Sequence, residues 1–149
     1  MENQNYELTQ VKKFVAPTKT KIASGILVCV GLIVAAYSLH LIMYTPHLLS
    51  LGCSPNDHVC YNVFIDMYLG ILLLFGAGGL AIGKKIGWWF GILSMILFGI
   101  AHTFVLISIF SSDLTAYVPL LLVFIAFLFL ILDQKNYFAA IETAKNKLK

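Results

Sequence analysis

The sequence predicts an all-α integral membrane protein, an antiparallel bundle of four transmembrane helices. Of its 149 residues, 60% are hydrophobic and only 11% are charged. A soluble domain of this length buries only about 70% of the surface of its unfolded chain, so it could not hide so much apolar surface. Crossing a bilayer takes about 20 apolar residues per helix. Four runs are long enough, at roughly 22–44, 63–82, 86–110 and 116–132.

The lysines predict which way these runs cross the membrane. All ten basic residues are lysines, and they precede the first run, separate the second from the third, or follow the fourth. Lys and Arg accumulate in cytoplasmic loops near the ends of spans. We therefore expect a single domain over 1–149 in the plasma (cytoplasmic) membrane, with Lys84, Lys85 and the tails 1–21 and 133–149 in the cytoplasm. The net charge of +3 is explained by topology and anionic lipid, which argues against a nucleic-acid partner.

Glycines predict how the second and third runs pack. The connection between them is so short that the two runs should form a tight antiparallel hairpin. Two pairs at a spacing of four flank the turn, Gly79 with Gly83 and Gly87 with Gly91. Small residues let helix backbones approach closely in lipid. We expect these glycines to serve helix packing; a flexible gating hinge is the alternative.

The fourth run and the tail that follows it are predicted to offer contact surfaces. The run has almost no small residues and many Leu and Phe, so we expect it at the periphery, facing lipid or a partner subunit. After residue 132, one helical face carries Tyr137, Ile141, Ala144 and Leu148. This pattern predicts a cytoplasmic interfacial or docking helix.

The loop between the first and second runs holds two cysteines, Cys53 and Cys60. The lysine pattern puts this loop outside, where an oxidising compartment favours a disulfide. His47, Asp57 and His58 lie nearby, so a metal site with the cysteines is the alternative, because two Cys and two His can bind zinc tetrahedrally. Their spacing matches no established zinc pattern, which favours the disulfide.

Three ionisable residues fall inside the runs: His40, Asp66 and His102. All three belong to the half of the bilayer that should face outward, with Tyr37 and Tyr68 as possible hydrogen-bonding neighbours. Ionisable groups in a span are costly to bury and often functional. A structural hydrogen-bond network is one interpretation and a position among headgroups is another. The third is a working site for protons, a metal, or a haem held by His40 and His102.

The function we expect first is that of an accessory or structural subunit of a larger membrane complex, for example a membrane oxidoreductase or monooxygenase. The chain is too short for a catalytic domain, so we expect no enzyme activity and no catalytic residues of its own, and we predict no cofactor. Its partners would be other integral membrane subunits and the lipid bilayer. It lacks the first-span Glu of small multidrug transporters and the Cys-x2-Cys pair of disulfide-forming quinone reductases.

Two further functions remain open from the sequence. One is a small transporter or channel that uses Asp66 with His40 and His102. The other is a redox or metal protein with a haem or copper site on the outer side. Each depends on whether the folded chain brings these side chains together.

Overall fold

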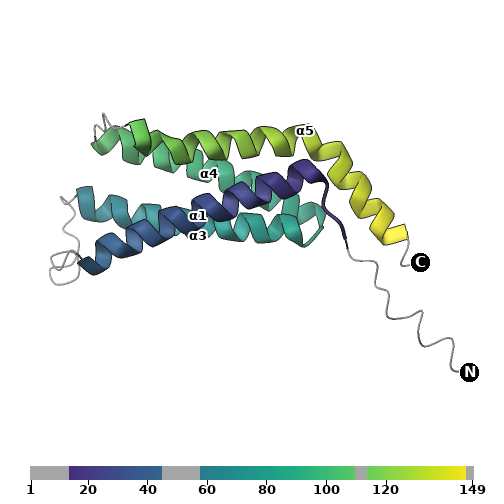
Figure 1. The fold of residues 1–149 in the computed structure, drawn as a ribbon, viewed down its shortest axis with the longest axis horizontal. Coiled ribbons are helices and arrows are strands. Elements are labelled where there is room, and N and C mark those ends of the chain that lie inside the picture. The colour runs from purple at the N-terminus through teal and green to yellow at the C-terminus, as the bar shows by residue number, and fades with distance from the viewer. Residues whose placement is uncertain (1–13, 45–57, 110–113, 147–149) are drawn as a thin grey trace, which may run out of the picture.

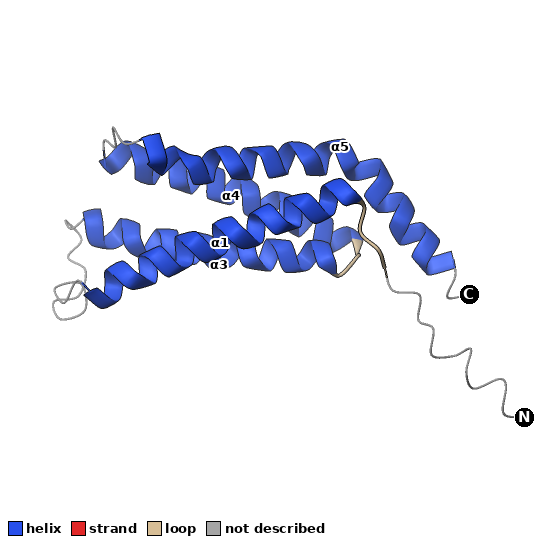
Figure 2. Ribbon diagram, viewed as in Figure 1, coloured by secondary structure: helices blue, strands red, loops and turns tan. Residues whose placement is uncertain are grey.

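The computed structural model describes residues 14–44, 58–109 and 114–146, and these residues are helical apart from short connections (Figure 2). Four of the described helices are each long and apolar enough to cross a membrane, which confirms the predicted all-α fold with four long apolar helices. They are α1 (Thr18–Tyr44), α3 (His58–Ala81), α4 (Lys85–Ile109) and α5 (Val118–Asn146), with the short 3-10 helix η1 (Leu114–Tyr117) before α5 (Figure 1).

Proline and glycine set several helix boundaries. α1 starts directly after Pro17, whose carbonyl accepts a 2.9 Å hydrogen bond from the Lys21 amide. α5 carries Pro119 in its first turn, where the missing N–H costs no helix hydrogen bond. α3 ends at Ala81, and Gly83 follows with a φ of 71°. That left-handed conformation is easy only for glycine, so the chain can turn sharply before α4.

The four long helices lie side by side around one core (Figure 1). Around the bundle, α1 contacts α3 and α5, while α4 contacts α3 closely and α5 more sparsely. Leu27, Leu73, Phe98 and Leu130, one from each helix, are fully buried in the centre. The seam between α4 and α5 is therefore the most open of the bundle.

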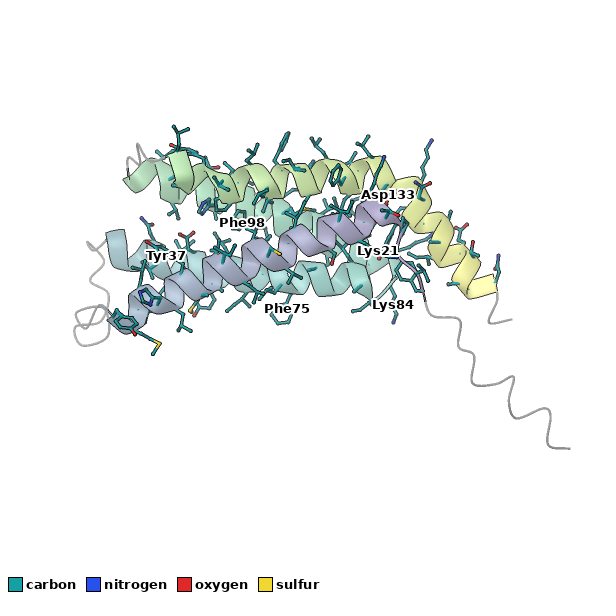
Figure 3. The ribbon with its side chains drawn as sticks, in the orientation of Figure 1. Lys21, Tyr37, Phe75, Lys84, Phe98 and Asp133 are labelled. Carbon is teal, nitrogen blue, oxygen red and sulfur yellow. The ribbon has the colours of Figure 1, made fainter. Side chains whose placement is uncertain are left out.

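The two ends of the bundle differ in charge. Lys21 and Lys84 lie at one end together with Asp133, whereas Tyr37 lies toward the other (Figure 3). We call these the lysine end and the opposite end. At the lysine end α5 bends near Asp133 and continues to Asn146 (Figure 3). The fourth predicted span and the predicted tail helix are thus one continuous helix.

Glycines permit the closest helix contacts. A Cβ built on Gly79 would lie 3.1 Å from the Gly87 carbonyl oxygen, and one on Gly91 would lie 2.9 Å from Leu80 Cγ. Three of the four glycines singled out from the sequence thus lie where α3 approaches α4, and Gly83 forms the turn.

A second close approach joins α1 to α3, at Gly31 and Gly70. A Cβ on Gly70 would lie 2.7 Å from the Ala35 amide nitrogen, and one on Gly31 would lie 2.8 Å from the Gly70 carbonyl oxygen. Dispersion contacts at such approaches are a main source of helix association in lipid. No pattern in the sequence singled out Gly31.

Candidate functional site

α3 and α4 bring Asp66 and His102 together. The Nδ1 atom of His102 lies 3.0 Å from Asp66 Oδ1. His102 is only 6% exposed, and the Asp66 side chain is 23% exposed. This polar contact lies within two helices that are apolar enough to span a membrane, where polar groups are costly unless they find a partner.

His102 is held from two further directions. Its ring is stacked on Phe98, one turn earlier on α4, with 5.0 Å between ring centroids and 18° between ring planes. Its Nε2 atom lies 3.4 Å from the carbonyl oxygen of Ala116 in η1. Each ring nitrogen therefore faces an oxygen that only accepts hydrogen bonds, provided that the Asp66 carboxyl is ionised.

That arrangement depends on the protonation of the ring. A neutral imidazole has one N–H, so it can donate to Asp66 or to the Ala116 carbonyl, but not to both. A protonated ring has two N–H groups and can donate to both oxygens. Gain or loss of one proton at His102 thus makes or breaks a contact between α4 and a neighbouring element.

The pair lines a cavity of about 240 Å³ at the junction of the helices. α1 contributes Tyr37 and the buried Ser38 to its wall, while η1 and the start of α5 contribute Ala116 and Pro119. The remaining lining residues are aliphatic: Ile33, Val34, Val105 and Leu106. All four long helices therefore contribute residues to the cavity that the Asp66–His102 pair lines.

His40 does not join Asp66 and His102. It is exposed, and its ring centroid lies 4.3 Å from that of Tyr44 on the same helix. His40 is absent from the lining of the cavity, and Tyr68 is also exposed. Helical spacing predicted the depth of His40 but not the direction in which its side chain points, and the bundle places that side chain outward.

The predicted outer-loop site falls largely outside the described residues. Cys53, His47 and Asp57 lie in the undescribed stretch 45–57, and α3 begins at His58, but the side chains of His58 and Cys60 are not described. The Cys53–Cys60 disulfide and the alternative metal site therefore remain predictions. Among the described residues no group of three or more His, Cys, Asp or Glu is placed to hold a metal ion.

A second polar cluster, at the lysine end, was not singled out from the sequence. Asp133 is only 2% exposed. Its Oδ2 atom accepts hydrogen bonds from the Thr20 amide at 3.0 Å and from Thr20 Oγ1 at 2.8 Å, and its Oδ1 atom accepts one from Asn136 Nδ2 at 2.9 Å. The carboxylate thus caps the first turn of α1, where amides lack helical partners and a negative charge is favoured.

Tyr137 extends this cluster by one turn of α5. Its hydroxyl donates to the Leu80 carbonyl at 3.1 Å and lies 3.4 Å from the Lys84 carbonyl, so it satisfies a carbonyl in the last turn of α3. Its ring contacts Phe14 edge to face at 5.5 Å. The sequence did carry a signal for this cluster: an acidic residue, Asp133, directly follows an apolar run, and an aromatic residue, Tyr137, lies four positions further on. We name Asp133, Thr20 and Tyr137 the end clasp.

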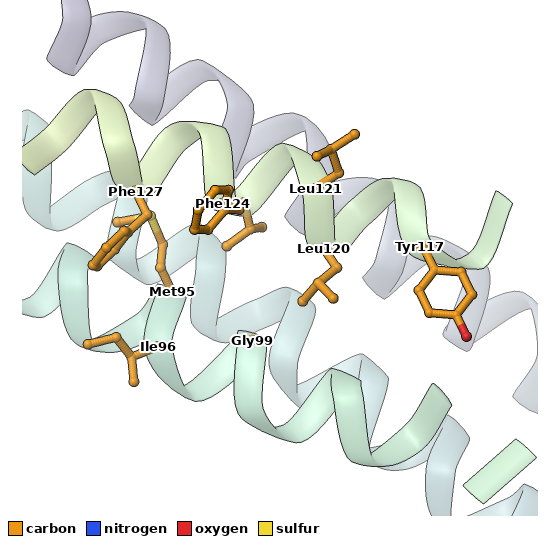
Figure 4. A pocket seen from close by; sticks show the side chains of 9 residues that line it. Met95, Ile96, Gly99, Tyr117, Leu120, Leu121, Phe124 and Phe127 are labelled. Carbon is orange, nitrogen blue, oxygen red and sulfur yellow. The ribbon is translucent and has the colours of Figure 1, made fainter. Parts of the chain in front are cut away.

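A larger cavity, of about 520 Å³, opens along the seam between α4 and α5 (Figure 4). Met95 and Ile96 of α4 face Phe124 and Phe127 of α5 across it (Figure 4). Its lining is apolar apart from the Tyr117 hydroxyl. It has the chemistry of a lipid-facing or protein-facing seam and none of the polar groups that catalysis needs.

Comparison of the chain with protein families, with curated proteins and with solved structures finds no match.

Proposed function

We propose that the chain is a small membrane transporter or channel whose working site is the Asp66–His102 pair. The observation that carries this proposal is the position of the His102 ring, between the Asp66 carboxyl and the Ala116 carbonyl, on a cavity bounded by all four long helices. Ionisable groups placed this way in a membrane are a common feature of proton and ion pathways.

The chemistry of the pair suits a proton-responsive site. Imidazole is the side chain that ordinarily changes charge between about pH 5 and 8. The protonated ring can tie α4 to both α3 and η1, whereas the neutral ring can hold only one of them. Proton binding would therefore shift the balance between two arrangements of the cavity, as alternating access requires.

The proposed orientation follows from the lysines. Lys19, Lys21, Lys84 and Lys85 lie at the end of the bundle where α1 and α4 begin. By the positive-inside rule this end is cytoplasmic, both tails are cytoplasmic, and α3 and α4 form an antiparallel hairpin that turns on that side. Asp66 and His102 then lie in the outer half of a cytoplasmic membrane, and protons would reach them from outside.

Proton flux into liposomes that contain the purified protein tests this function. With a pH-sensitive dye inside and a potassium–valinomycin potential as the driving force, the wild type should acidify the lumen faster than empty liposomes. Asp66→Asn should abolish the flux while the protein keeps its fold, because the amide still accepts a hydrogen bond from His102. His40→Gln is the matched control, because His40 is an exposed histidine on the same half of the bundle, and it should leave the flux unchanged.

A structural network predicts a different result. In that case Asp66→Asn would keep the helix association of the wild type, because the amide still forms the hydrogen bond. Asp66→Leu would weaken helix association by about 1–2 kcal/mol, the scale of hydrogen bonds between helices in model membranes. A wild type with no flux above that of empty liposomes refutes the transport proposal, as does an Asp66→Leu variant with wild-type flux.

The surface of α5 favours a second candidate, the accessory or structural subunit of a membrane complex. Within its apolar stretch α5 has the smallest buried share of the four spans. Leu121, Phe124 and Leu128 are exposed on it, beside the cavity at the α4–α5 seam. The proposed partner is an apolar helix of another integral membrane subunit, such as one of an oxidoreductase or monooxygenase.

Native mass spectrometry in mild detergent, on protein extracted from its own membrane, tests the second candidate. A complex of defined mass with unrelated chains that is lost in a Phe124→Lys variant would support it. A lone monomer would contradict it and would leave lipid as the covering of α5.

A further inference from the structure

We infer that the Asp66–His102 cavity binds a small organic ammonium ion, and that this ion competes with the proton at His102. The inference rests on the proposed function and names its substrate class. It is drawn from the charge of the cavity, the chemistry of its walls and its size.

The net charge of the cavity depends on whether His102 carries one proton more or less. Among its ten lining residues, Asp66 is the one acidic group and His102 the one base, with Tyr37 as the third titratable side chain. No Lys or Arg occurs between Lys21 and Lys84 or between Lys85 and Lys135, so no permanent cation lies on these spans to neutralise the carboxylate. With His102 neutral the site carries one negative charge; with His102 protonated it carries none.

A partly buried negative charge in a membrane needs a cation nearby, because its transfer from water is costly. When His102 is protonated, the imidazolium supplies that cation. When His102 is neutral, a positively charged ligand in the cavity would take its place. Proton and ligand therefore stabilise the same carboxylate and should exclude each other.

The walls favour an organic cation over a metal ion. Only Tyr37, Ser38 and Asp66 among the lining residues carry side-chain oxygens, whereas calcium takes six to eight oxygen ligands. The aliphatic side chains of Ile33 and Val34 on α1 would contact carbon substituents instead. The Tyr37 ring, on the same wall, can attract an ammonium group through its π face.

The size of the cavity restricts the ligand further. Its volume of about 240 Å³ lies below the range of about 300–1,000 Å³ that accommodates drug-sized molecules. An ammonium ion with a few methyl or ethyl groups matches this space. A quaternary ammonium ion isolates the effect of charge, since it has no N–H and cannot lose a proton.

Isothermal titration calorimetry with tetramethylammonium chloride tests the inference on the full chain in detergent micelles. Sodium chloride at equal ionic strength controls for screening, and tert-butanol, of similar shape but uncharged, controls for apolar filling. We expect saturable binding of tetramethylammonium alone at about pH 7.5. At about pH 5.5 the apparent affinity should be lower, because a protonated His102 supplies the cation beside Asp66 and excludes tetramethylammonium.

Variants separate the two roles. His102→Gln should still bind tetramethylammonium, because the amide N–H can donate to Asp66, but its affinity should no longer depend on pH in this range. Asp66→Asn should lose binding, and His40→Gln should keep both binding and pH dependence. Melting temperatures show whether each variant is folded; if Asp66→Asn is not, the pH profile of His102→Gln decides.

Several results would overturn the inference: no saturable binding of tetramethylammonium, equal binding of tert-butanol, or a wild-type pH profile in His102→Gln. Failure of the transport proposal looks different. Proton flux that requires Asp66, without ammonium binding, would keep the function and remove this substrate class. Ammonium binding without any flux would keep the site and remove the transport function.

Discussion

Removal of the Asp133 carboxylate should destabilise the lysine end of the protein. Asp133 lies 113 residues from Thr20 in the sequence, yet it accepts hydrogen bonds from both the amide and the hydroxyl of Thr20. Both residues are almost fully buried. The Asp133→Leu variant has a side chain of similar length but no hydrogen-bond acceptors, so it isolates the effect of the cap.

The expected magnitude follows from the groups left without partners. Truncation of a helix N-cap costs about 0.5–2 kcal/mol, and a buried donor left unsatisfied costs about 1–3 kcal/mol. Because the Thr20 hydroxyl can rotate toward another acceptor, only the amide counts in full. We expect Asp133→Leu to lower the free energy of unfolding by about 2–4 kcal/mol and Asp133→Asn by about 1 kcal/mol, since an amide oxygen still accepts.

Unfolding in mixed micelles, with increasing dodecyl sulfate and circular dichroism as the signal, measures these differences. Glu142→Leu is the control: it removes an exposed carboxylate from the same helix, and we expect a change within about 0.5 kcal/mol. Hydrogen exchange locates the effect, because the amides of the first turn of α1 should exchange faster in Asp133→Leu. Unfolding free energies equal to wild type, with unchanged exchange near Thr20, would refute the reasoning.

Three further predictions concern packing, topology and the loop cysteines. Gly70→Ala should cost about 1–3 kcal/mol in the same unfolding assay, because its Cβ would meet backbone atoms of α1, whereas Gly78→Ala, whose Cβ would meet nothing within 4 Å, should be nearly neutral; equal effects would contradict the close approach. In a variant with every native cysteine replaced by serine, Lys84→Cys should react with an impermeant thiol reagent only after cells are permeabilised, and labelling of intact cells would reverse the proposed topology. Alkylation of the unreduced protein should leave Cys53 and Cys60 unmodified if they form the disulfide, and their modification would favour the metal alternative.

Helical periodicity predicted part of the candidate site. Asp66 and His102 could be placed at similar depth because an α-helix rises about 1.5 Å per residue, and the structure indeed puts them 3.0 Å apart. The same count placed His40 at that depth but could not fix its direction. With apolar residues on every side of α1, no hydrophobic face indicates which way the helix turns toward its neighbours.

The end clasp could not be predicted for a related reason. Its partners come from the first and last helices, and a sequence pattern reports only on residues a few positions apart. From the sequence alone, the Asp133 carboxylate would be taken for a solvated charge in a polar tail. The structure shows that α5 continues past its apolar stretch and bends near Asp133, which meets the start of α1 (Figure 3).

Four apolar helices could be predicted from composition and run length alone, because these two properties decide whether a segment is stable in a bilayer. The glycines of the α3–α4 contact could also be predicted, because two small residues four positions apart lie on the same face of a helix. The folded structure was needed to show that His40 stays apart from Asp66 and His102, that Gly31 meets Gly70, and that Asp133 caps α1. These contacts depend on the rotation of each helix about its axis, which side-chain packing among all four helices sets together.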